Sequence, residues 1–255
     1  MLTVPIVIPD LHGRSDLLIA ALEHYATDTE FIFLGDAIDR GPDSRGTVRR
    51  LLELSDAGRV TLLRGNHENM LLRASTFDAQ AQESGDIRLL GAAREEFLNW
   101  QRNGGNTLFR EYGLFGPGNI PDDLLEFIGR MQLAVITRNH YLCTHAAPPV
   151  TLERYGSEEM TMMWARPNEG PFALEPGLIG SIHGHTPLGV PTWVGQHLYI
   201  DTGAVFSGQL CTVDTDTLQS VVLRGSPVPG REVLLELTSE EAGLVREQPF
   251  TIVDV

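Results

Sequence analysis

The sequence is poor in cysteine, in long apolar runs and in positive charge. Its two cysteines, Cys143 and Cys211, share no metal-type spacing and stand in apolar runs, which predicts buried free thiols rather than a disulfide or a thiolate site. No apolar run approaches the roughly 20 residues of a membrane span, and the first residues lack the basic region of a signal peptide. We therefore expect a cytoplasmic protein without a membrane partner.

The net charge is −15, because 34 acidic residues outnumber 19 basic ones. A field of this sign repels the phosphate backbone and argues against nucleic acid as the main partner. The same field does not exclude a small phosphorylated substrate, because a bound metal ion can make the electrostatic potential inside a pocket positive. The 255 residues and 42% hydrophobic content are enough for a large core in one or two domains.

Three apolar runs, at residues 3–10, 30–36 and 60–63, alternate with two helical patterns. This βαβαβ order predicts a parallel sheet with crossover helices. From 77 to 131 the pattern is mostly helical, with a break at the sequence NGGN. The run 132–145 looks like a hairpin, and four later runs of short strands suggest a second, largely antiparallel sheet.

No repeat or linker divides the chain. We therefore expect a single domain over residues 1–255, with a helical insertion over about 77–131 and a C-terminal tail over about 226–255. The tail ends in FTIVDV, which fits either an edge strand or a partner surface.

Polar side chains follow five of the expected strands. They are Asp10, His12, Asp36, Asp39, Arg40, Asn66, His67, His145 and His185. Each alone has an ordinary explanation as a turn residue, a helix cap or a core histidine. Strands of one sheet bring their carboxyl ends together, so the set predicts a binding site at that edge. Carboxylate and imidazole donors suit Mn²⁺, Fe or Zn²⁺, and a metal pair bridged by one aspartate can hydrolyse phosphoesters.

Five segments, in the order DLHGR, GDAIDRGPDS, LLRGNHE, THAAPP and HGHTP, resemble the phosphoprotein phosphatase family of dinuclear metallophosphoesterases. The resemblance runs from about Asp10 to Gln209. WQRNGGNTL and YIDTGAVFSGQL are similar to its bacterial branch, which contains bacteriophage lambda protein phosphatase and symmetrical diadenosine tetraphosphate hydrolases. The resemblance implies an α/β fold, a four-layer α/β/β/α sandwich of two mixed sheets flanked by helices. It also implies two divalent metal ions, with Mn²⁺ expected first and Fe or Zn²⁺ as alternatives.

The resemblance assigns metal ligands residue by residue. One ion would be held by Asp10, His12 and Asp36. The other would share Asp36 as the bridging carboxylate, and its full ligand set would be Asp36, Asn66, His145 and His185. A hydroxide that bridges the two ions would then attack phosphorus.

The resemblance also assigns the groups that act on the substrate. His67 would be the general acid, oriented by Asp39. Arg40 and Arg166 would bind the substrate phosphate together with Asn66. Glu68 is expected to support the site or the start of the following helix, because acidic residues favour the first helical turn.

Pro9 stands where the family usually has glycine. Proline fixes φ and donates no hydrogen bond, so the position must already have φ near −65° and a free amide if Asp10 is to stay in place. His183 is expected to support its strand or the ligands rather than to bind metal. His24, His140 and His197 fall in helix or turn contexts and are expected to be solvated or structural.

Two activities fit this core. The first expectation is a serine/threonine protein phosphatase-like hydrolase that acts on phosphorylated proteins or small phosphomonoesters. The alternative is a symmetrical bis(5'-nucleosyl)-tetraphosphate pyrophosphohydrolase. A nucleotide site would use aromatic platforms beside basic residues, for which Trp100, Arg102, Phe109, Arg110 and Tyr112 are available, although a helix core explains the aromatic residues equally well. A catalytically inactive binding module would lack a ligand or the acid, and none is missing. The oligomeric state is not predicted.

Overall fold

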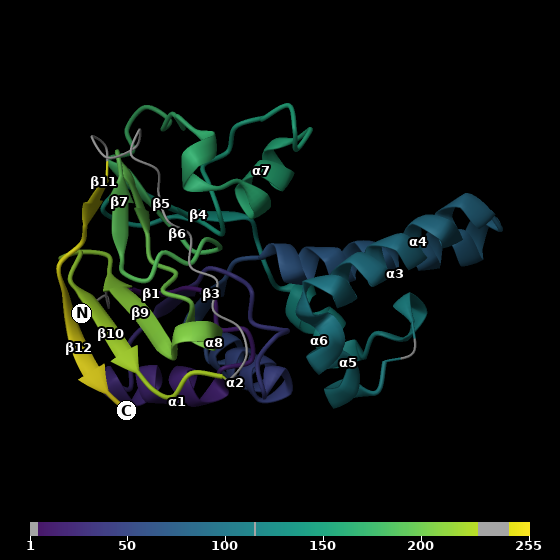
Figure 1. Ribbon diagram of the computed structural model, residues 1–255, viewed down its shortest axis with the longest axis horizontal. Coiled ribbons are helices and arrows are strands. Elements are labelled where there is room, and N and C mark those ends of the chain that lie inside the picture. The colour runs from purple at the N-terminus through teal and green to yellow at the C-terminus, as the bar shows by residue number, and fades with distance from the viewer. Residues whose placement is uncertain (1–4, 115, 229–244) are drawn as a thin grey trace.

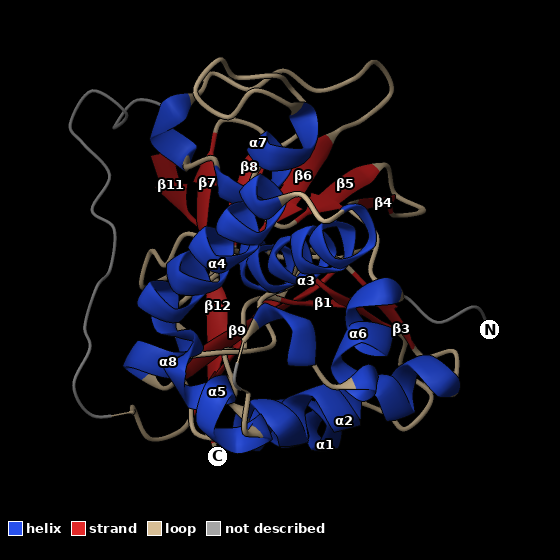
Figure 2. Ribbon diagram, turned by 90° about the vertical axis from the view of Figure 1, so that its right-hand side faces the viewer, coloured by secondary structure: helices blue, strands red, loops and turns tan. Residues whose placement is uncertain are grey.

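The computed structural model describes residues 5–114, 116–228 and 245–255. Two six-stranded mixed sheets pack together, and helices cover their outer faces (Figures 1 and 2). This is the four-layer α/β/β/α sandwich that the sequence predicted. Among the described residues, no helix combines the length and the apolar character needed to cross a bilayer.

The strand order of the first sheet is β12-β10-β9-β1-β2-β3, and that of the second is β11-β7-β8-β6-β5-β4. The first sheet consists of β1 (Ile6–Ile8), β2 (Phe31–Phe33), β3 (Val60–Leu62), β9 (Gln209–Asp214), β10 (Ser220–Arg224) and β12 (Phe250–Asp254). The second consists of β4 (Ala134–Ile136), β5 (Tyr141–Thr144), β6 (Gly180–His183), β7 (Thr192–Val194), β8 (His197–Tyr199) and β11 (Val245–Glu247). The helices are α1 (Ser15–His24), α2 (Ser44–Asp56), α3 (Asn66–Ser84), α4 (Ile87–Trp100), α5 (Asn106–Tyr112), α6 (Asp122–Gly129), α7 (Glu158–Trp164) and α8 (Ala204–Ser207).

Strands β1, β2 and β3 are parallel neighbours, joined by the crossover helices α1 and α2, as the sequence predicted. Successive β1 side chains serve two cores because strand residues alternate between faces. Ile6 and Ile8 pack into the cluster beneath the helices, whereas Val7 packs between the two sheets. All three are buried, so the carboxyl ends of these strands are held rigidly.

The later strands differ from the expectation of a separate, largely antiparallel sheet. Strand β9 pairs antiparallel with β1 and brings β10 into the first sheet, while β5, β6 and β8 of the second sheet are parallel neighbours. Local alternation does not encode a partner about 200 residues away. The β4–β5 hairpin is confirmed, and residues 250–254 form an edge strand, which is one of the two interpretations left open for the tail. The part of the expected tail at 229–244 lies outside the described residues.

Helices α3 and α4 form a helical hairpin (residues 66–100) that projects from the sheets (Figure 1). Helix α3 ends at Gly85, which adopts the left-handed conformation with φ of 70°. Helix α4 then starts at Ile87, with the Asp86 carboxylate accepting from the Arg88 amide. The hairpin leads at its base into a kinked turn (Gln101–Gly105), where Gly104 has φ of 115°.

Candidate functional site

Backbone strain is concentrated where the polar loops follow the strands. Among the described residues, seven non-glycine residues have positive φ, and five of them are candidate site residues: His12, Asp36, Asp39, Arg40 and His185. A non-glycine residue in this region is disfavoured and persists only where the surrounding structure fixes it. The strain therefore marks the loops after β1, β2 and β6 as a functional region.

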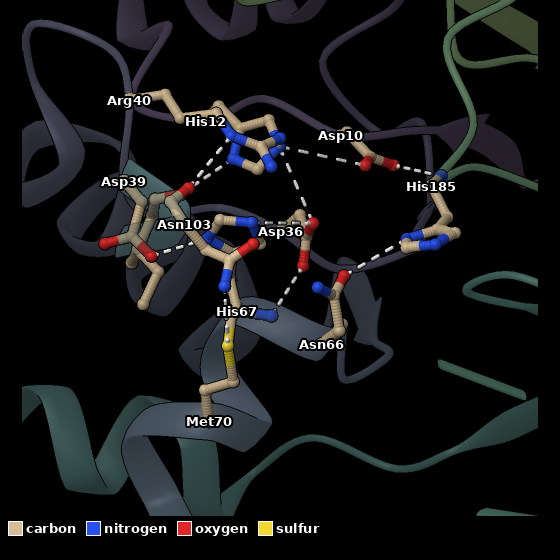
Figure 3. Close-up of polar contacts among 12 residues, drawn as sticks. Asp10, His12, Asp36, Asp39, Arg40, Asn66, His67, Met70, Asn103 and His185 are labelled. Carbon is tan, nitrogen blue, oxygen red and sulfur yellow. Dashed lines mark hydrogen bonds and ion pairs between the residues drawn. The ribbon is translucent and has the colours of Figure 1, made fainter. Parts of the chain in front are cut away.

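Asp36 lies between two groups of candidate ligands (Figure 3). Its Oδ2 is 3.5 Å from His12 Nε2, and its Oδ1 is 3.6 Å from His145 Nε2. Asp10 completes the first group, with Oδ2 at 4.0 Å from His12 Nε2. The two oxygens of one carboxylate thus face two separate imidazoles, which is the arrangement a bridging ligand needs.

The second group is built around the Asn66 side chain. Its Oδ1 is 3.0 Å from His145 Nε2 and 3.1 Å from His185 Nδ1. Ligand atoms of Asp36, His145 and His185 all lie within 4.8 Å of one another. Six side chains from five loops therefore converge, and the structure brings together every residue that the sequence nominated as a ligand.

Each of the three histidines has one ring nitrogen bonded to a main-chain carbonyl and presents the other to the cluster. Nδ1 of His12, Nδ1 of His145 and Nε2 of His185 contact the carbonyl oxygens of Ile38, Leu34 and Trp164, respectively, at 2.8, 2.9 and 3.2 Å. A nitrogen that donates to a carbonyl carries the ring proton, so the opposite nitrogen keeps its lone pair. Histidines that ligate metals are held in this way.

Burial supports a cationic occupant. It is the largest cause that raises the pKa values of Asp10 and Asp36, and it lowers the pKa of His145 to about 3. The imidazoles are therefore neutral, and the buried carboxylates need positive charge nearby. Two glycines make room for the carboxylates, since a Cβ at Gly65 would lie 2.0 Å from Asp36 Oδ1 and one at Gly184 would lie 2.2 Å from Asp10 Oδ1. The residues fit two divalent ions bound by oxygen and nitrogen.

Glu68 supports the loop of Asp36, as the sequence suggested. Its carboxylate accepts from three main-chain amides, those of Asp36 at 2.9 Å, Ala37 at 2.8 Å and Gly65 at 3.1 Å. Glu68 is fully buried in the first turn of α3. One carboxylate thus ties the loop after β2 to the loop after β3 and caps the helix that carries Asn66.

His67 differs from the three histidines above. Its ring contacts the carboxylate of Asp39, whereas theirs contact main-chain carbonyls. Nδ1 of His67 donates to Oδ2 of Asp39 over 2.6 Å, and both side chains are fully buried. Within the described residues, Nε2 of His67 has no hydrogen-bond partner, and it lies 3.9 Å from Asp36 Oδ2. An orphaned ring nitrogen beside the cluster is where a substrate oxygen can be contacted.

The two candidate phosphate-binding arginines differ in exposure. Arg40 is partly buried, with its guanidinium in contact with His12 and its Cζ 5.7 Å from the centre of the Phe206 ring. Arg166 is exposed in the loop after α7. Its charge contributes to lowering the pKa of His185, after the larger effects of burial and His145. Both arginines thus contribute positive charge near the cluster.

Asp201 was not among the expected site residues, and it is buried beside the first group of ligands. After burial, its charge is the next cause that raises the pKa of Asp10, and its own pKa is raised by burial to about 6. Its Oδ1 accepts from the Gly203 amide at 2.8 Å. Asp201 lies in the segment YIDTGAVFSGQL, which is part of the resemblance to the bacterial branch of the family. That segment was the signal from which the residue could have been found.

Both ring nitrogens of His183 are hydrogen-bonded to neighbouring side chains, which fits the supporting position expected for it. Its ring nitrogens contact Thr144 Oγ1 at 2.8 Å and Ser181 Oγ at 2.7 Å, and Ser181 also contacts His197 Nδ1 at 2.7 Å. His197 is structural, as expected, but it does not lie in a turn: it is buried on β8. The aromatic residues Trp100, Phe109 and Tyr112 pack in the helix core.

Comparisons with known proteins agree with this geometry. Residues 5–204 match the model of the calcineurin-like phosphoesterase family. Serine/threonine-protein phosphatase 1 of Salmonella typhimurium is 29% identical over 215 residues, which cover 80% of this chain and 88% of the relative. The symmetrical bis(5'-nucleosyl)-tetraphosphatase of Ralstonia nicotianae is 29% identical over 135 residues, which cover 50% of this chain and 48% of that protein.

Solved structures show the same fold. A candidate diadenosine tetraphosphatase superposes with a TM-score of 0.58 at 17% identity, over 88% of this chain and 95% of that chain. A serine/threonine phosphatase from Saccharomyces cerevisiae gives a TM-score of 0.52 at 14% identity, over 83% and 73%. The resemblance to the phosphoprotein phosphatases is confirmed, and this chain, a hydrolase of the metallophosphoesterase type, belongs to the calcineurin-like phosphoesterase family.

Proposed function

We propose that this enzyme hydrolyses phosphomonoesters, with phosphoserine and phosphothreonine side chains of proteins as its first substrate class. The observation that carries the proposal is the buried His67–Asp39 pair, which presents an unpartnered Nε2 beside Asp36. A serine alkoxide is a poor leaving group and needs a proton as its bond to phosphorus breaks. The near full-length likeness to a bacterial serine/threonine phosphatase supports the same substrate class.

Two divalent ions, with Mn²⁺ as the first expectation, would be held by the six converging side chains and would supply an acidified water and positive charge. The six are Asp10, His12, Asp36, Asn66, His145 and His185. The Arg40 guanidinium and the Asn66 amide group would bind phosphate oxygens, and the exposed Arg166 would approach from the loop after α7. Charge-assisted contacts of this kind fix the phosphate for in-line displacement.

His67 would donate the proton to the leaving oxygen from Nε2, from an imidazolium ring that carries a proton on each nitrogen and is balanced by the Asp39 carboxylate. Asp39 would hold the proton on Nδ1, because its Oδ2 accepts from that nitrogen at 2.6 Å. The pair also keeps the ring oriented, since both side chains are buried and cannot rotate into solvent. The expected contribution of a positioned general acid is about 10²–10⁴-fold.

A leaving-group series tests this role. His67→Asn should retain both metals and slow the hydrolysis of a phosphoserine peptide far more than that of p-nitrophenyl phosphate, whose leaving group needs little protonation. Asp39→Asn should give the same bias in weaker form. Metal content and kcat for both substrates are measured for each variant. Loss of a metal from His67→Asn, or equal slowing of both substrates, would show that His67 is not the acid.

The second candidate function is symmetrical hydrolysis of dinucleoside tetraphosphates, supported by the likeness to the Ralstonia enzyme over half of this chain. Against it, Trp100 is fully buried, and Phe109 and Tyr112 pack on the same core, so these aromatic residues are not open platforms for a base. Parallel assays with a phosphoserine peptide and diadenosine tetraphosphate in Mn²⁺ decide between the two functions. A higher kcat/KM for the dinucleotide would favour the second.

A further inference from the structure

The kinked turn at the base of the helical hairpin contacts two of the proposed catalytic groups. Trp100, the last residue of α4, donates from its indole Nε1 to Oδ2 of Asp39 at 2.7 Å. The main-chain oxygen of Gly104 accepts from the Arg40 amide at 3.1 Å, and that of Asn103 accepts from Arg40 Nε at 3.3 Å (Figure 3). The segment WQRNGG therefore contacts Arg40 and the His67–Asp39 pair, called the acid pair below, and none of its residues is a proposed metal ligand.

The carboxylate of Asp39 is held asymmetrically. Its Oδ2 accepts two hydrogen bonds, from Trp100 Nε1 and from His67 Nδ1, whereas its Oδ1 has no hydrogen-bond partner among the described residues. Asp39 is fully buried, so no rotation into solvent can relieve this arrangement. The two donors fix which oxygen faces His67.

The chemistry of the indole explains why its position matters. The indole N–H is a donor only and does not titrate in the physiological range. The Trp100 N–H stabilises negative charge on Oδ2, so it makes this oxygen a weaker base toward the proton that it shares with His67 Nδ1. The hydrogen bond from Trp100 therefore favours the shared proton on Nδ1, and a second proton on the ring would sit on Nε2, the nitrogen that faces the cluster.

We propose that Trp100 is a positioning residue for proton donation to the leaving group, acting through the Asp39 carboxylate on His67. The inference rests on the proposed role of His67 as the acid. Through Trp100, the helical hairpin supports the step that poor leaving groups require and leaves metal binding unaffected.

The packing around Trp100 shows that its ring is placed by close contacts. A Cβ at Gly105 would lie 2.3 Å from Trp100 Cε2, and a Cβ at Gly104 would lie 2.6 Å from Arg40 Cγ, so the two glycines let the turn close onto both side chains. Phe97 also packs against Trp100, with ring centroids 5.1 Å apart, and its side chain has no polar atom. Phe97 therefore provides a control that loosens the same cluster without removing a hydrogen bond.

The test compares Trp100→Phe with Phe97→Leu. Trp100→Phe keeps an aromatic ring and loses the N–H, so we expect kcat for a phosphoserine peptide to fall about tenfold, a part of the full value of a general acid. For p-nitrophenyl phosphate we expect a change of less than about twofold, with unchanged manganese content. Phe97→Leu should lower the melting temperature and leave the ratio of the two rates as in the wild type.

A double-mutant cycle identifies the route. If Trp100 acts through Asp39, Trp100→Phe should not change the ratio further in an Asp39→Asn background. An unchanged ratio in Trp100→Phe, while His67→Asn shows the bias, overturns the inference and leaves the proposed function intact. Equal slowing of both substrates by His67→Asn overturns both. If Trp100→Phe does not fold, 3-benzothienylalanine at position 100 replaces the N–H with sulfur at nearly constant shape, and the same outcomes apply.

Discussion

Replacing Glu68 with glutamine should weaken metal binding although Glu68 is no ligand. Its two oxygens accept from the amides of Asp36, Ala37 and Gly65. A glutamine side chain keeps one oxygen, so its NH₂ group must face at least one of these amides, donor against donor. A buried amide left without its partner costs about 1–3 kcal/mol. Changes to groups that orient ligands typically cost about 10–100-fold in metal affinity, and we expect a loss in that range here.

A second effect has a different pH dependence. After burial, the charge of Glu68 is the next cause that raises the pKa of Asp36. Glu68→Gln therefore lowers the pKa of Asp36, which reduces proton competition with the metal at low pH. The affinity loss should be larger at pH 8 than at pH 6, because only the geometric effect and the lost attraction for the cation remain at high pH.

The assay is Mn²⁺ titration by calorimetry after chelation, at both pH values, with melting temperatures of the metal-free proteins. Glu53→Gln is the matched control, because Glu53 lies on the surface of α2 and pairs with Arg50 at 2.7 Å. An affinity of Glu68→Gln within about threefold of the control would refute the view that this carboxylate positions the bridging residue.

Three further expectations concern Asp36, Asp201 and Pro9. Asp36→Asn should be the most damaging ligand change, losing more than roughly 100-fold in Mn²⁺-restored activity, because in the proposed site both ions would share this carboxylate; full activity in a verified metal-free preparation would contradict the role of metal altogether. Burial raises the folded pKa of Asp201 to about 6, above the roughly 3.9 of an unfolded chain, so its ionisation destabilises the metal-free fold as pH rises through this window. In chelator, Asp201→Asn should therefore raise the melting temperature at pH 8 and not at pH 4, and the gain in the free energy of unfolding at pH 8 should be up to about 3 kcal/mol. The exposed control Asp28→Asn should leave the melting temperature unchanged at both pH values. Pro9→Gly should lower stability by about 0.5–1 kcal/mol through the unfolded chain and leave Mn²⁺ affinity unchanged, and a tighter metal site in this variant would show that proline displaces Asp10.

The convergence of the site could be predicted because it follows from a simple rule. Parallel strands of one sheet end at the same edge, so Asp10, Asp36 and Asn66 had to approach one another once the βαβαβ order was recognised. The expectation of a bridging position for Asp36 is consistent with its oxygens lying 3.5 and 3.6 Å from His12 and His145. The individual roles of these residues stay predictions until the variants are measured.

Two features could not be predicted, for different physical reasons. The pairing of β9 with β1 joins two strands about 200 residues apart in the chain. The alternation of apolar residues in a short strand does not specify which distant strand it pairs with. The bond from Trp100 to Asp39 depends on how the helical hairpin packs against the loop after β2, a contact between segments about 60 residues apart in the chain. The sequence shows Trp100 near a pair of glycines, which is compatible both with a residue of the helix core and with a platform that stacks on a nucleotide base.

The helical hairpin offers an attachment point for protein engineering. It starts at Asn66, next to His67, ends at Trp100 and turns at Gly85, where a Cβ would meet no atom within 4 Å. The 19 residues of α3 place this turn about 28 Å from the acid pair along a continuous helix. A ligand-binding domain inserted at Gly85 would therefore be joined to both catalytic contacts by rigid helices. Ligand binding that splays those helices would be read out as a change in leaving-group preference, which makes the enzyme a scaffold for a sensor with an enzymatic output.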